Sequence, residues 1–310
     1  MNAFAQWRAG SRRALSAIVF VAGLVVLPAQ AAISQLVVFG DSLSDNGNLF
    51  AVTGTPPAPY FNGRFSNGPV AVEVMAKLLG VPLVDLAYGG AQTGTNVPAS
   101  PLFSIPSVVT QVTQYLTGKP GIDGGALYML WGGPNDLLGG LGVPGFDVAG
   151  AIGNGIANLK KAYDLLAAAG GKQFLVPLMP DLGITVRARG GGATQNLTVS
   201  AISSNWNALL KATFAGRPGV TVFDTFALSD NVWFSPSSFG LTNVLTSCLG
   251  ASSVCSNPGQ TYFWDDIHPT AAVHAILGTA FAGVFRVSEP GTLALLATLM
   301  LVGVVGVRRR

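Results

Sequence analysis

Histidine, cysteine and charged residues are all scarce in this sequence. Its 310 residues include only two histidines and two cysteines, and charged side chains make up 10 % of the chain. A protein zinc site draws its ligands mainly from clustered Cys and His, so no metal is expected, and no organic cofactor is expected either. No basic patch interleaved with aromatic residues is visible, so nucleic acid is not an expected partner.

The formal charge of +3 comes from the two ends of the chain rather than from its body. Residues 32–287 contain 11 Lys and Arg against 13 Asp and Glu, which gives a net charge near −2. The first 31 residues combine three arginines, the apolar run Ala14–Leu27 and the small-residue site Ala29-Gln30-Ala31. This pattern predicts a secretory signal peptide over residues 1–31. A permanent N-terminal membrane helix is the alternative, but the apolar run is short for a full span.

The C-terminal residues 288–310 carry a second targeting pattern. Ser288-Glu289-Pro290-Gly291 precedes the uncharged stretch Thr292–Val307, which is followed by three arginines. The stretch is slightly short for a spanning helix, which needs about 17–25 residues, and the arginines would stay cytoplasmic. The segment resembles the PEP-CTERM sorting signal, with Ser288 in place of the first proline. The resemblance implies transient membrane contact and processing by an exosortase-like protease, in addition to a signal peptidase at the other end. It also implies export to the periplasm, the outer surface or the outside of a Gram-negative cell.

The two cysteines, Cys248 and Cys255, are close together in a loop-like stretch. In an exported chain, an even and local pair of cysteines predicts a disulfide. Two free thiols are the alternative.

The region between the two signals, residues 32–287, is predicted to be one domain. Apolar runs typical of strands alternate with helix-like segments, an order that predicts a mainly parallel sheet covered on both faces. The predicted strands are Gln35–Phe39, Leu83–Ala87, Ala126–Trp131, Gln173–Leu178 and Val220–Phe226. The predicted helices are Pro69–Leu79, with a cap at Ser66 or Asn67 and an end at Gly80, Val148–Ala169, Asn196–Ala215 and Thr270–Phe285.

Three connections are too long for minimal loops, namely Ala51–Phe65, Thr93–Pro106 and Ser235–Gln260. They are either functional loops over an active-site face or plain surface insertions. The sequence favours neither interpretation.

The segment Val37-Val38-Phe39-Gly40-Asp41-Ser42 contains the leading catalytic candidate. Its apolar run reads as a buried strand, and Ser42 follows that strand directly after a glycine-permitted turn. Ligands of open α/β sheets bind at the carboxyl ends of the strands, where this serine would lie. A serine hydroxyl is a poor nucleophile unless a base and a group that orients the base lie beside it.

Only His268 and His274 can serve as an imidazole base. Pro269 biases His268 away from helical backbone, so Asp265 and His268 are expected in a turn before the last helix. Such a turn can bring the Asp265 carboxylate to Nδ1 and leave Nε2 for Ser42. Asp266 is the alternative orienting carboxylate, and His274, inside the helix, is expected to be structural.

Two further segments could donate hydrogen bonds to a developing oxyanion. Gly89-Gly90 follows the second strand, and Asn135 follows the third in the segment Gly132-Gly133-Pro134-Asn135-Asp136. Each signal is weak alone, since Gly-Gly is usually a turn and Asn-Asp a helix cap. The motif at Ser42 lacks the second glycine of the nucleophile elbow, and the acid stands only three residues before the histidine. The α/β-hydrolase fold is therefore disfavoured.

In order along the chain, these segments resemble the four sequence blocks of the GDSL, or SGNH, hydrolases. The resemblance implies Ser42 as nucleophile, Asp265 and His268 as its partners, and Ser42, Gly90 and Asn135 as oxyanion donors, with Gly89 a less suitable register. It also implies a flavodoxin-like three-layer α/β/α fold with a mainly parallel five-stranded sheet. Asp45-Asn46-Gly47-Asn48 and the segment 63–68 further resemble the lipolytic branch of that family.

Five other polar residues near these blocks are expected to be structural rather than catalytic. Four of them, Asp41, Asp45, Asn48 and Asp136, are expected to hold the loops around Ser42 and Asn135. Arg64 is expected to be solvated or salt-bridged, and contact with a polar head group is the alternative.

The sequence thus predicts an exported serine esterase or lipase that hydrolyses a small-molecule or lipid ester through an acyl-enzyme. An acyltransferase with the same site is one alternative. A non-catalytic surface or matrix protein is the other, and the tail resemblance motivates it.

Overall fold

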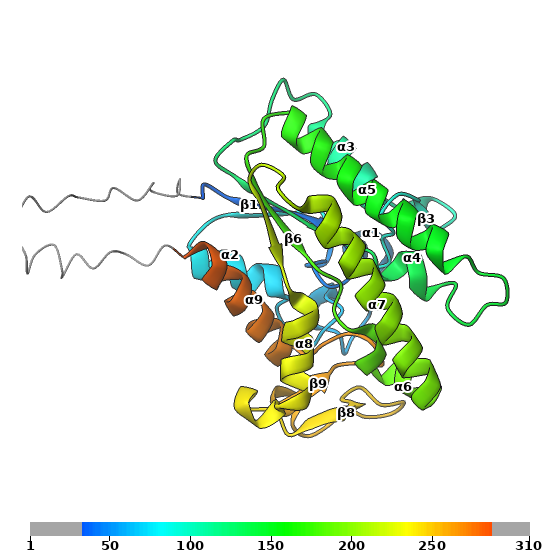
Figure 1. Cartoon of the computed structure of the whole chain (residues 1–310). Helices are drawn as coiled ribbons and strands as arrows, with labels where there is room; N and C mark the ends of the chain where they lie inside the picture. The colour runs from blue at the N-terminus through cyan, green and yellow to red at the C-terminus, as the bar shows by residue number, and fades with distance from the viewer. Residues whose placement is uncertain (1–32, 287–310) are drawn as a thin grey trace, which may run out of the picture. The chain divides into compact units, whose positions relative to one another are not determined.

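Five parallel strands form the centre of the protein (Figure 1). The computed structural model describes residues 33–286. The strands lie side by side in the order β2-β1-β5-β6-β7. Their bounds are β1 Leu36–Gly40, β2 Leu83–Asp85, β5 Leu127–Trp131, β6 Gln173–Pro177 and β7 Val220–Phe223. The prediction of a mainly parallel five-stranded sheet is confirmed.

The interior position of β1 in the sheet follows from its sequence. All five residues of β1 and all five of β5 are buried, as expected for apolar strands covered on both faces. Val38 pairs with Asp85 of β2 on one side and with Met129 of β5 on the other. The strand order reverses between β1 and β5, so the carboxyl ends of these two strands form the switch point where α/β sheets bind ligands.

Helices cover both faces of the sheet and complete three layers, as predicted. On one face a buried apolar cluster joins the sheet to α3, α5 and α7. On the other a second cluster joins it to α2, α8 and α9. The bounds of these helices are α2 Ala71–Leu79, α3 Val108–Leu116, α5 Val148–Ala168, α7 Ala193–Phe214, α8 Thr225–Phe234 and α9 Ala271–Phe285.

The predicted cap of α2 is wrong, although its predicted end at Gly80 is confirmed by a left-handed φ of 69°. The residue before the helix is Val70, whose N–H donates to Oε2 of Glu73 at 2.9 Å. Ser66 and Asn67 lie too far before Ala71 to reach the first turn. Ser66 bonds instead to Pro269, just before α9, and Asn67 bonds to Ala271, the first residue of α9.

The predicted strand Val220–Phe226 is too long. The strand ends at Phe223, and Asp224 caps α8 by accepting a hydrogen bond from the N–H of Ala227 at 2.9 Å. The apolar residues after Asp224 therefore belong to a helix that the sequence pattern did not separate from the strand. Helix α7 likewise begins three residues before its predicted start at Asn196.

The three long connections contain short elements rather than structureless loops. The first includes part of α1 Asn48–Thr53 and a 3₁₀ turn, the second is a hairpin, and the third contains β8, which pairs in parallel with β9. The remaining bounds are β3 Val97–Ser100, β4 Phe103–Ile105, α4 Pro134–Leu138, α6 Val186–Gly190, β8 Asn243–Ser247 and β9 Thr261–Phe263, with 3₁₀ turns at Phe61–Gly63, Leu182–Ile184, Pro236–Phe239 and Pro258–Gln260.

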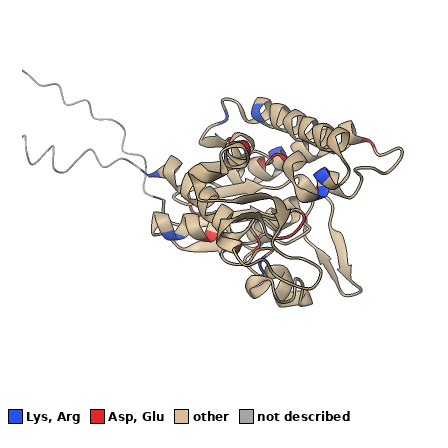
Figure 2. Ribbon diagram, turned by 90° about the horizontal axis from the view of Figure 1, so that it is seen from below, with Lys and Arg blue, Asp and Glu red and all other residues tan. Residues whose placement is uncertain are grey.

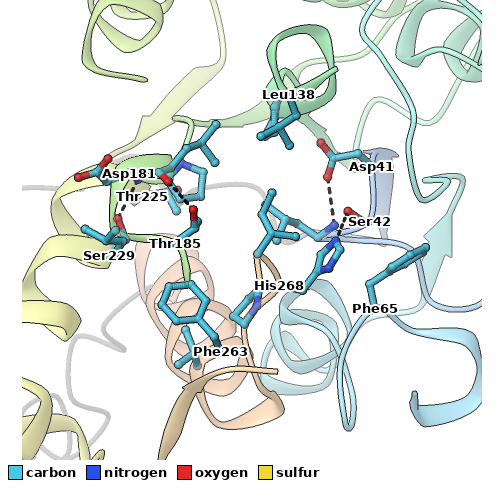
Figure 3. Close-up of a pocket in the computed structure, with 18 of the residues that line it drawn as sticks. Asp41, Ser42, Phe65, Leu138, Asp181, Thr185, Thr225, Ser229, Phe263 and His268 are labelled. Carbon is cyan, nitrogen blue, oxygen red and sulfur yellow. Dashed lines mark hydrogen bonds between the residues drawn. The ribbon is translucent and has the colours of Figure 1, made fainter. Parts of the chain in front are cut away.

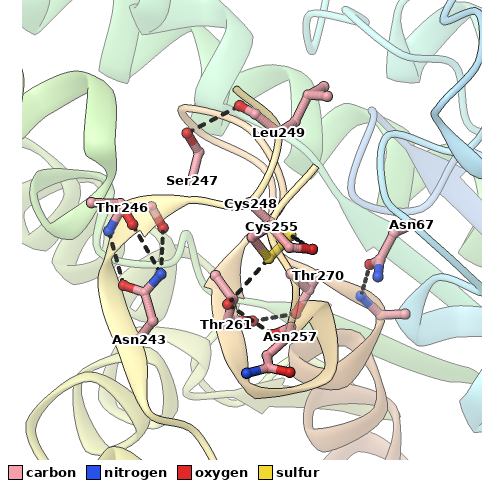
Figure 4. The surroundings of a disulfide bond; sticks show 11 residues. Asn67, Asn243, Thr246, Ser247, Cys248, Leu249, Cys255, Asn257, Thr261 and Thr270 are labelled. Atoms are coloured by element: carbon pink, nitrogen blue, oxygen red, sulfur yellow. Dashed lines mark hydrogen bonds between the residues drawn. A yellow bond between two sulfur atoms is a disulfide. The ribbon is translucent and has the colours of Figure 1, made fainter. Parts of the chain in front are cut away.

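Cys248 and Cys255 are joined in a disulfide beside the β8–β9 pair (Figure 4). Their Cα atoms are 4.7 Å apart. The N–H of Cys255 also donates to the carbonyl oxygen of Cys248 at 2.8 Å, so the bridge closes a tight loop.

The predicted signal peptide and the predicted sorting signal both lie outside the described residues. Within residues 33–286, no helix combines the length and the apolar character needed to cross a membrane. Charged residues are sparse along this part of the chain (Figure 2).

Candidate active site

Ser42 lies in a turn immediately after β1. The turn is closed by the N–H groups of Ser44 and Asp45, which both donate to the carbonyl oxygen of Asp41 at 3.0 Å. Glycine is required just before it, because a Cβ on Gly40 would come within 2.4 Å of the Trp131 carbonyl oxygen. The turn therefore packs tightly against the end of β5 and presents the Ser42 side chain, which is 9 % exposed, at the switch point.

Ser42, His268 and Asp265 form a continuous chain of hydrogen bonds. The Ser42 Oγ lies 2.8 Å from His268 Nε2, and His268 Nδ1 lies 2.7 Å from Asp265 Oδ2. Figure 3 shows Ser42 and His268 side by side at one end of a cavity. In the neutral tautomer whose Nδ1–H donates to Asp265, Nε2 accepts the Ser42 proton. The structure thus brings together the three residues that the sequence grouped.

The turn that carries Asp265 and His268 is held by the carboxylate of Asp265. Asp265 Oδ1 accepts hydrogen bonds from the N–H groups of Ile267 and His268, at 2.9 and 2.7 Å. Burial alone would raise the pKa of Asp265, but the bonds and charge of His268 and the two backbone N–H groups outweigh it and lower that pKa to about 2. Asp265 is therefore a carboxylate throughout the neutral range.

The two alternative residues lie elsewhere. Asp266 makes a two-bond ion pair with Arg187, at 2.8 and 3.1 Å, and its side chain is half exposed. His274 is buried inside α9, where its Nδ1 accepts a hydrogen bond from the N–H of Ala71 at 3.1 Å. Burial lowers the pKa of His274 to about 3, so it is a neutral structural group.

Gly90 and Asn135 both line the cavity beside Ser42. Gly90 has a φ of 79°, a left-handed conformation in which glycine is favoured. One hydrogen of the Asn135 amide is donated to the Ala91 carbonyl oxygen at 3.0 Å, and the other has no partner among residues 33–286. The Gly89 N–H is already donated to Asp45 Oδ2 at 2.7 Å, which leaves Gly90 as the suitable register.

Asp45, Asn48 and Asp136 hold the surrounding loops, as the sequence suggested. Asp45 accepts hydrogen bonds from backbone N–H groups after the Ser42 turn and from the Gly89 N–H after β2. Asn48 donates to two carbonyl oxygens at and just after the end of β2, and Asp136 accepts both the N–H and the hydroxyl of Thr93. Arg64 is salt-bridged to Glu73 at 2.7 Å.

Asp41 differs from these structural carboxylates. Its Oδ1 accepts the N–H of Leu43 at 3.0 Å, but its Oδ2 is buried without a hydrogen-bond partner in the described part of the chain. Burial raises the pKa of Asp41 to about 7, because few groups compensate the charge. Asp41 also lines the cavity and directly precedes Ser42 in the chain.

The cavity has a volume of about 250 Å³ and runs from the Ser42–His268 pair to a polar end. Apolar side chains form its middle, among them Trp131, Ile184, Phe263 and Leu277. The polar end is lined by Asp181, Thr185, Thr225 and Ser229, opposite Ser42 in Figure 3. None of these polar residues lies in a recognisable sequence motif, so residue patterns alone do not predict them.

Tyr60 and Phe65 are two further residues near Asp265 and His268. The Tyr60 hydroxyl donates to Asp265 Oδ2 at 2.8 Å, and the Phe65 ring lies 5.0 Å from the His268 ring. Both belong to the first long connection, Ala51–Phe65, so this connection contacts the Asp265–His268 turn. No local pattern connects Tyr60 to a carboxylate 205 positions later.

Among residues 33–286 there is no group of three or more His, Cys, Asp or Glu side chains that could hold a metal ion. The site consists of a serine, a histidine and a carboxylate in one chain of hydrogen bonds, with Gly90 and Asn135 beside them on a mainly apolar cavity. This arrangement is suited to acyl transfer through a covalent intermediate.

The fold and the site are those of a carboxylic ester hydrolase. More specifically, the chain belongs to the family described as GDSL-like Lipase/Acylhydrolase, whose model matches residues 36–281.

Two relatives illustrate this membership. The Thermolabile hemolysin of Vibrio parahaemolyticus is 31 % identical over 270 residues, which cover 78 % of this chain and 61 % of the hemolysin. The match therefore spans less than two thirds of that relative. The Phosphatidylcholine-sterol acyltransferase of Aeromonas hydrophila is 28 % identical over 82 % of this chain and 92 % of its own length.

Among solved structures, the carbohydrate acetylesterase Est24 of Sinorhizobium meliloti aligns with a TM-score of 0.48 at 17 % identity. The alignment covers 81 % of this chain and 98 % of that one.

Proposed function

We propose that this protein is an exported serine esterase or lipase that cleaves carboxylic esters through an acyl-enzyme. The observation that carries the proposal is the unbroken chain from Ser42 Oγ through His268 to Asp265, at 2.8 and 2.7 Å. Ser42 attacks the ester carbonyl carbon while His268 takes its proton. His268 then returns the proton to the leaving alcohol. Water attacks the acyl-enzyme with His268 again as base, which releases the acid and restores Ser42.

The negative oxygen of each tetrahedral intermediate needs preorganised donors. The backbone N–H groups of Ser42 and Gly90 and the free amide hydrogen of Asn135 are proposed for this role. The three residues line the same cavity, and Asn135 is fixed by its bond to Ala91. No reorganisation is then needed as the charge develops.

The apolar middle of the cavity favours the acyl part of a lipid or small-molecule ester as its occupant. Export is supported by the signal-peptide pattern of residues 1–31 and by the disulfide, a bond typical of oxidising compartments. Processing by a signal peptidase and an exosortase-like protease, with transient membrane contact of residues 288–310, remains part of the proposal.

Acyl transfer to an acceptor other than water is the second candidate. It is favoured by the similarity to an acyltransferase that covers 92 % of that relative. Both reactions share the acyl-enzyme, so the site geometry is the same for each. A non-catalytic surface role is disfavoured, because an idle site has no need of an aligned serine, histidine and carboxylate.

The test is hydrolysis of p-nitrophenyl esters from acetyl to palmitoyl by the purified protein, with Ser42→Ala measured in parallel. We expect the substitution to lower kcat by about 10⁴-fold or more. The chain-length profile then separates an esterase from a lipase, and product analysis with added alcohols or sterols measures acyl transfer. Unchanged activity in Ser42→Ala would overturn the proposal.

A further inference from the structure

Residues 60–67 are tied to residues 265–271 at three points. Ser66 Oγ donates to the Pro269 carbonyl oxygen at 2.9 Å, and Asn67 Oδ1 accepts the N–H of Ala271 at 2.8 Å. Tyr60 makes the third link, to the side chain of Asp265. The first segment therefore lies along the whole turn that carries the base.

Tyr60 differs from the other two links because it bonds to a catalytic side chain rather than to backbone. Its hydroxyl reaches the same oxygen, Asp265 Oδ2, that bonds His268 Nδ1. The Tyr60 ring is held edge-on by Trp264 and Phe65, with centroids 6.1 and 6.2 Å away. The packing of the Tyr60 ring therefore fixes the direction of its hydroxyl.

All the hydrogen bonds of the Asp265 carboxylate are then accounted for. Oδ1 accepts two backbone N–H groups, and Oδ2 accepts Tyr60 and His268. Burial and the charge of Asp265 raise the pKa of Tyr60 above its ordinary value, so this hydroxyl stays a donor over the neutral range.

We propose that Tyr60 is a positioning residue for the catalytic pair: its hydroxyl fixes the Asp265 carboxylate against His268 and limits how strongly that carboxylate attracts the imidazolium. The proposal rests on the proposed ester hydrolysis by Ser42. It adds a residue that supports this reaction without touching the substrate.

Four other titratable groups influence this pair, and none contacts the Tyr60 hydroxyl. Asp266 is engaged by Arg187, Asp41 interacts with His268 by charge across Ser42, and His274 is neutral inside α9. The Tyr60 hydroxyl is therefore the group whose removal changes the Asp265 carboxylate most directly without altering the site in other ways.

The sign of the effect follows from the shared oxygen. When the hydroxyl is removed, Asp265 Oδ2 keeps more negative charge for His268 and stabilises the protonated imidazole. A protonated His268 cannot accept the Ser42 proton. Activity should then be lost at a higher pH on the acid side of the profile, a direction opposite to that expected if the Asp265–His268 pair were merely loosened.

The experiment compares kcat/KM against pH for the wild type, Tyr60→Phe and Ser66→Ala. Phe keeps the ring packing, and Ser66→Ala removes a link between the same two segments that does not touch Asp265. In Tyr60→Phe we expect the acid limb to move up by about 0.5–1 pH unit and kcat to fall about tenfold with little change in KM. In Ser66→Ala we expect the limb to stay at the wild-type pH.

The pH dependence of fluorophosphonate labelling reads the same ionisation without an ester, and thermal unfolding checks that each variant is folded. A Tyr60→Phe limb that stays in place or moves down overturns the proposal, as does an equal shift in Ser66→Ala. These results differ from failure of the proposed function itself, in which the wild type is inactive or Ser42→Ala retains activity.

Discussion

Ser42, Gly90 and Asn135 lie beyond the carboxyl ends of β1, β2 and β5, whereas Asp265 and His268 lie in a turn after the outer pair β8–β9. The first group, the nucleophile side, is held by the buried sheet and by short turns. The second group, the base side, is held by hydrogen bonds from a distant loop. The sheet therefore places the proposed nucleophile and oxyanion donors, and the loop contacts help to place the proposed base and its carboxylate.

The largest expected effect on kcat distinguishes two neighbouring carboxylates on the base side, Asp265 and Asp266. Asp265→Asn should lower kcat by about 10⁴-fold, because an amide cannot hold His268 in the tautomer that accepts the Ser42 proton. Asp266→Asn breaks only a half-exposed pair with Arg187, which is worth about 0–1 kcal/mol.

We expect Asp266→Asn to stay within about twofold of the wild type, since such surface pairs contribute little. Steady-state kinetics on one ester measures both variants. Equal losses in the two would mean that the turn as a whole, and not the Asp265 carboxylate, orients the base.

On the nucleophile side, Asn135→Ala should lower kcat by about 10²–10³-fold with KM nearly unchanged, as loss of one oxyanion donor does. The expected pH profile keeps its wild-type limbs, because Asn135 bonds to Ala91 and not to the proton-transfer pair. A shifted limb in this variant would show that the two sides are not independent.

Asp41 tests how much the nucleophile side lowers the free energy of unfolding. Its pKa is raised from 3.8 to about 7. At pH values between these two, Asp41 is therefore protonated in the folded state and ionised in the unfolded state. Stability should therefore fall as the pH rises from 5 to 7, by about 2 kcal/mol from this group. Urea unfolding of Asp41→Asn, compared with the wild type at pH 5 and 7, should show that this fall is largely absent. An equal pH dependence in the two proteins would mean that Asp41 is not the source.

The disulfide is expected to have the smallest effect on catalysis, because it contributes to stability alone. The double substitution of Cys248 and Cys255 by Ser opens a short loop beside β8–β9, which should cost about 2–3 kcal/mol of unfolding free energy. The acid limb of the activity profile should stay in place, because the bridge does not contact Asp265 or His268. Thermal unfolding and the pH profile measure the two quantities separately.

Much of the nucleophile side could be predicted from sequence because its causes are local. The apolar run before Ser42 specifies a buried strand, and the glycines at 40 and 90 mark backbone that approaches closely or turns left-handed. The Asp265–His268 turn is local too, since its bonds span three residues or fewer.

The contacts that the sequence did not reveal are between distant segments. Tyr60 meets Asp265 across 205 positions, and the polar end of the cavity combines Asp181 with Ser229. Ser66 and Asn67 have good capping chemistry, but they bond to Pro269 and Ala271, before and at the start of α9, and not to α2. Such contacts depend on how the helices pack against the sheet, which residue spacing alone does not specify.

The most direct test of the account is mass-spectrometric mapping of a fluorophosphonate on the wild type and on His268→Ala. The account predicts one adduct, on the peptide that contains Ser42, formed quickly in the wild type and at least about 10³-fold more slowly without the base. An adduct on another residue, or equal labelling of the two proteins, would contradict the claim that Ser42 is a nucleophile activated by His268.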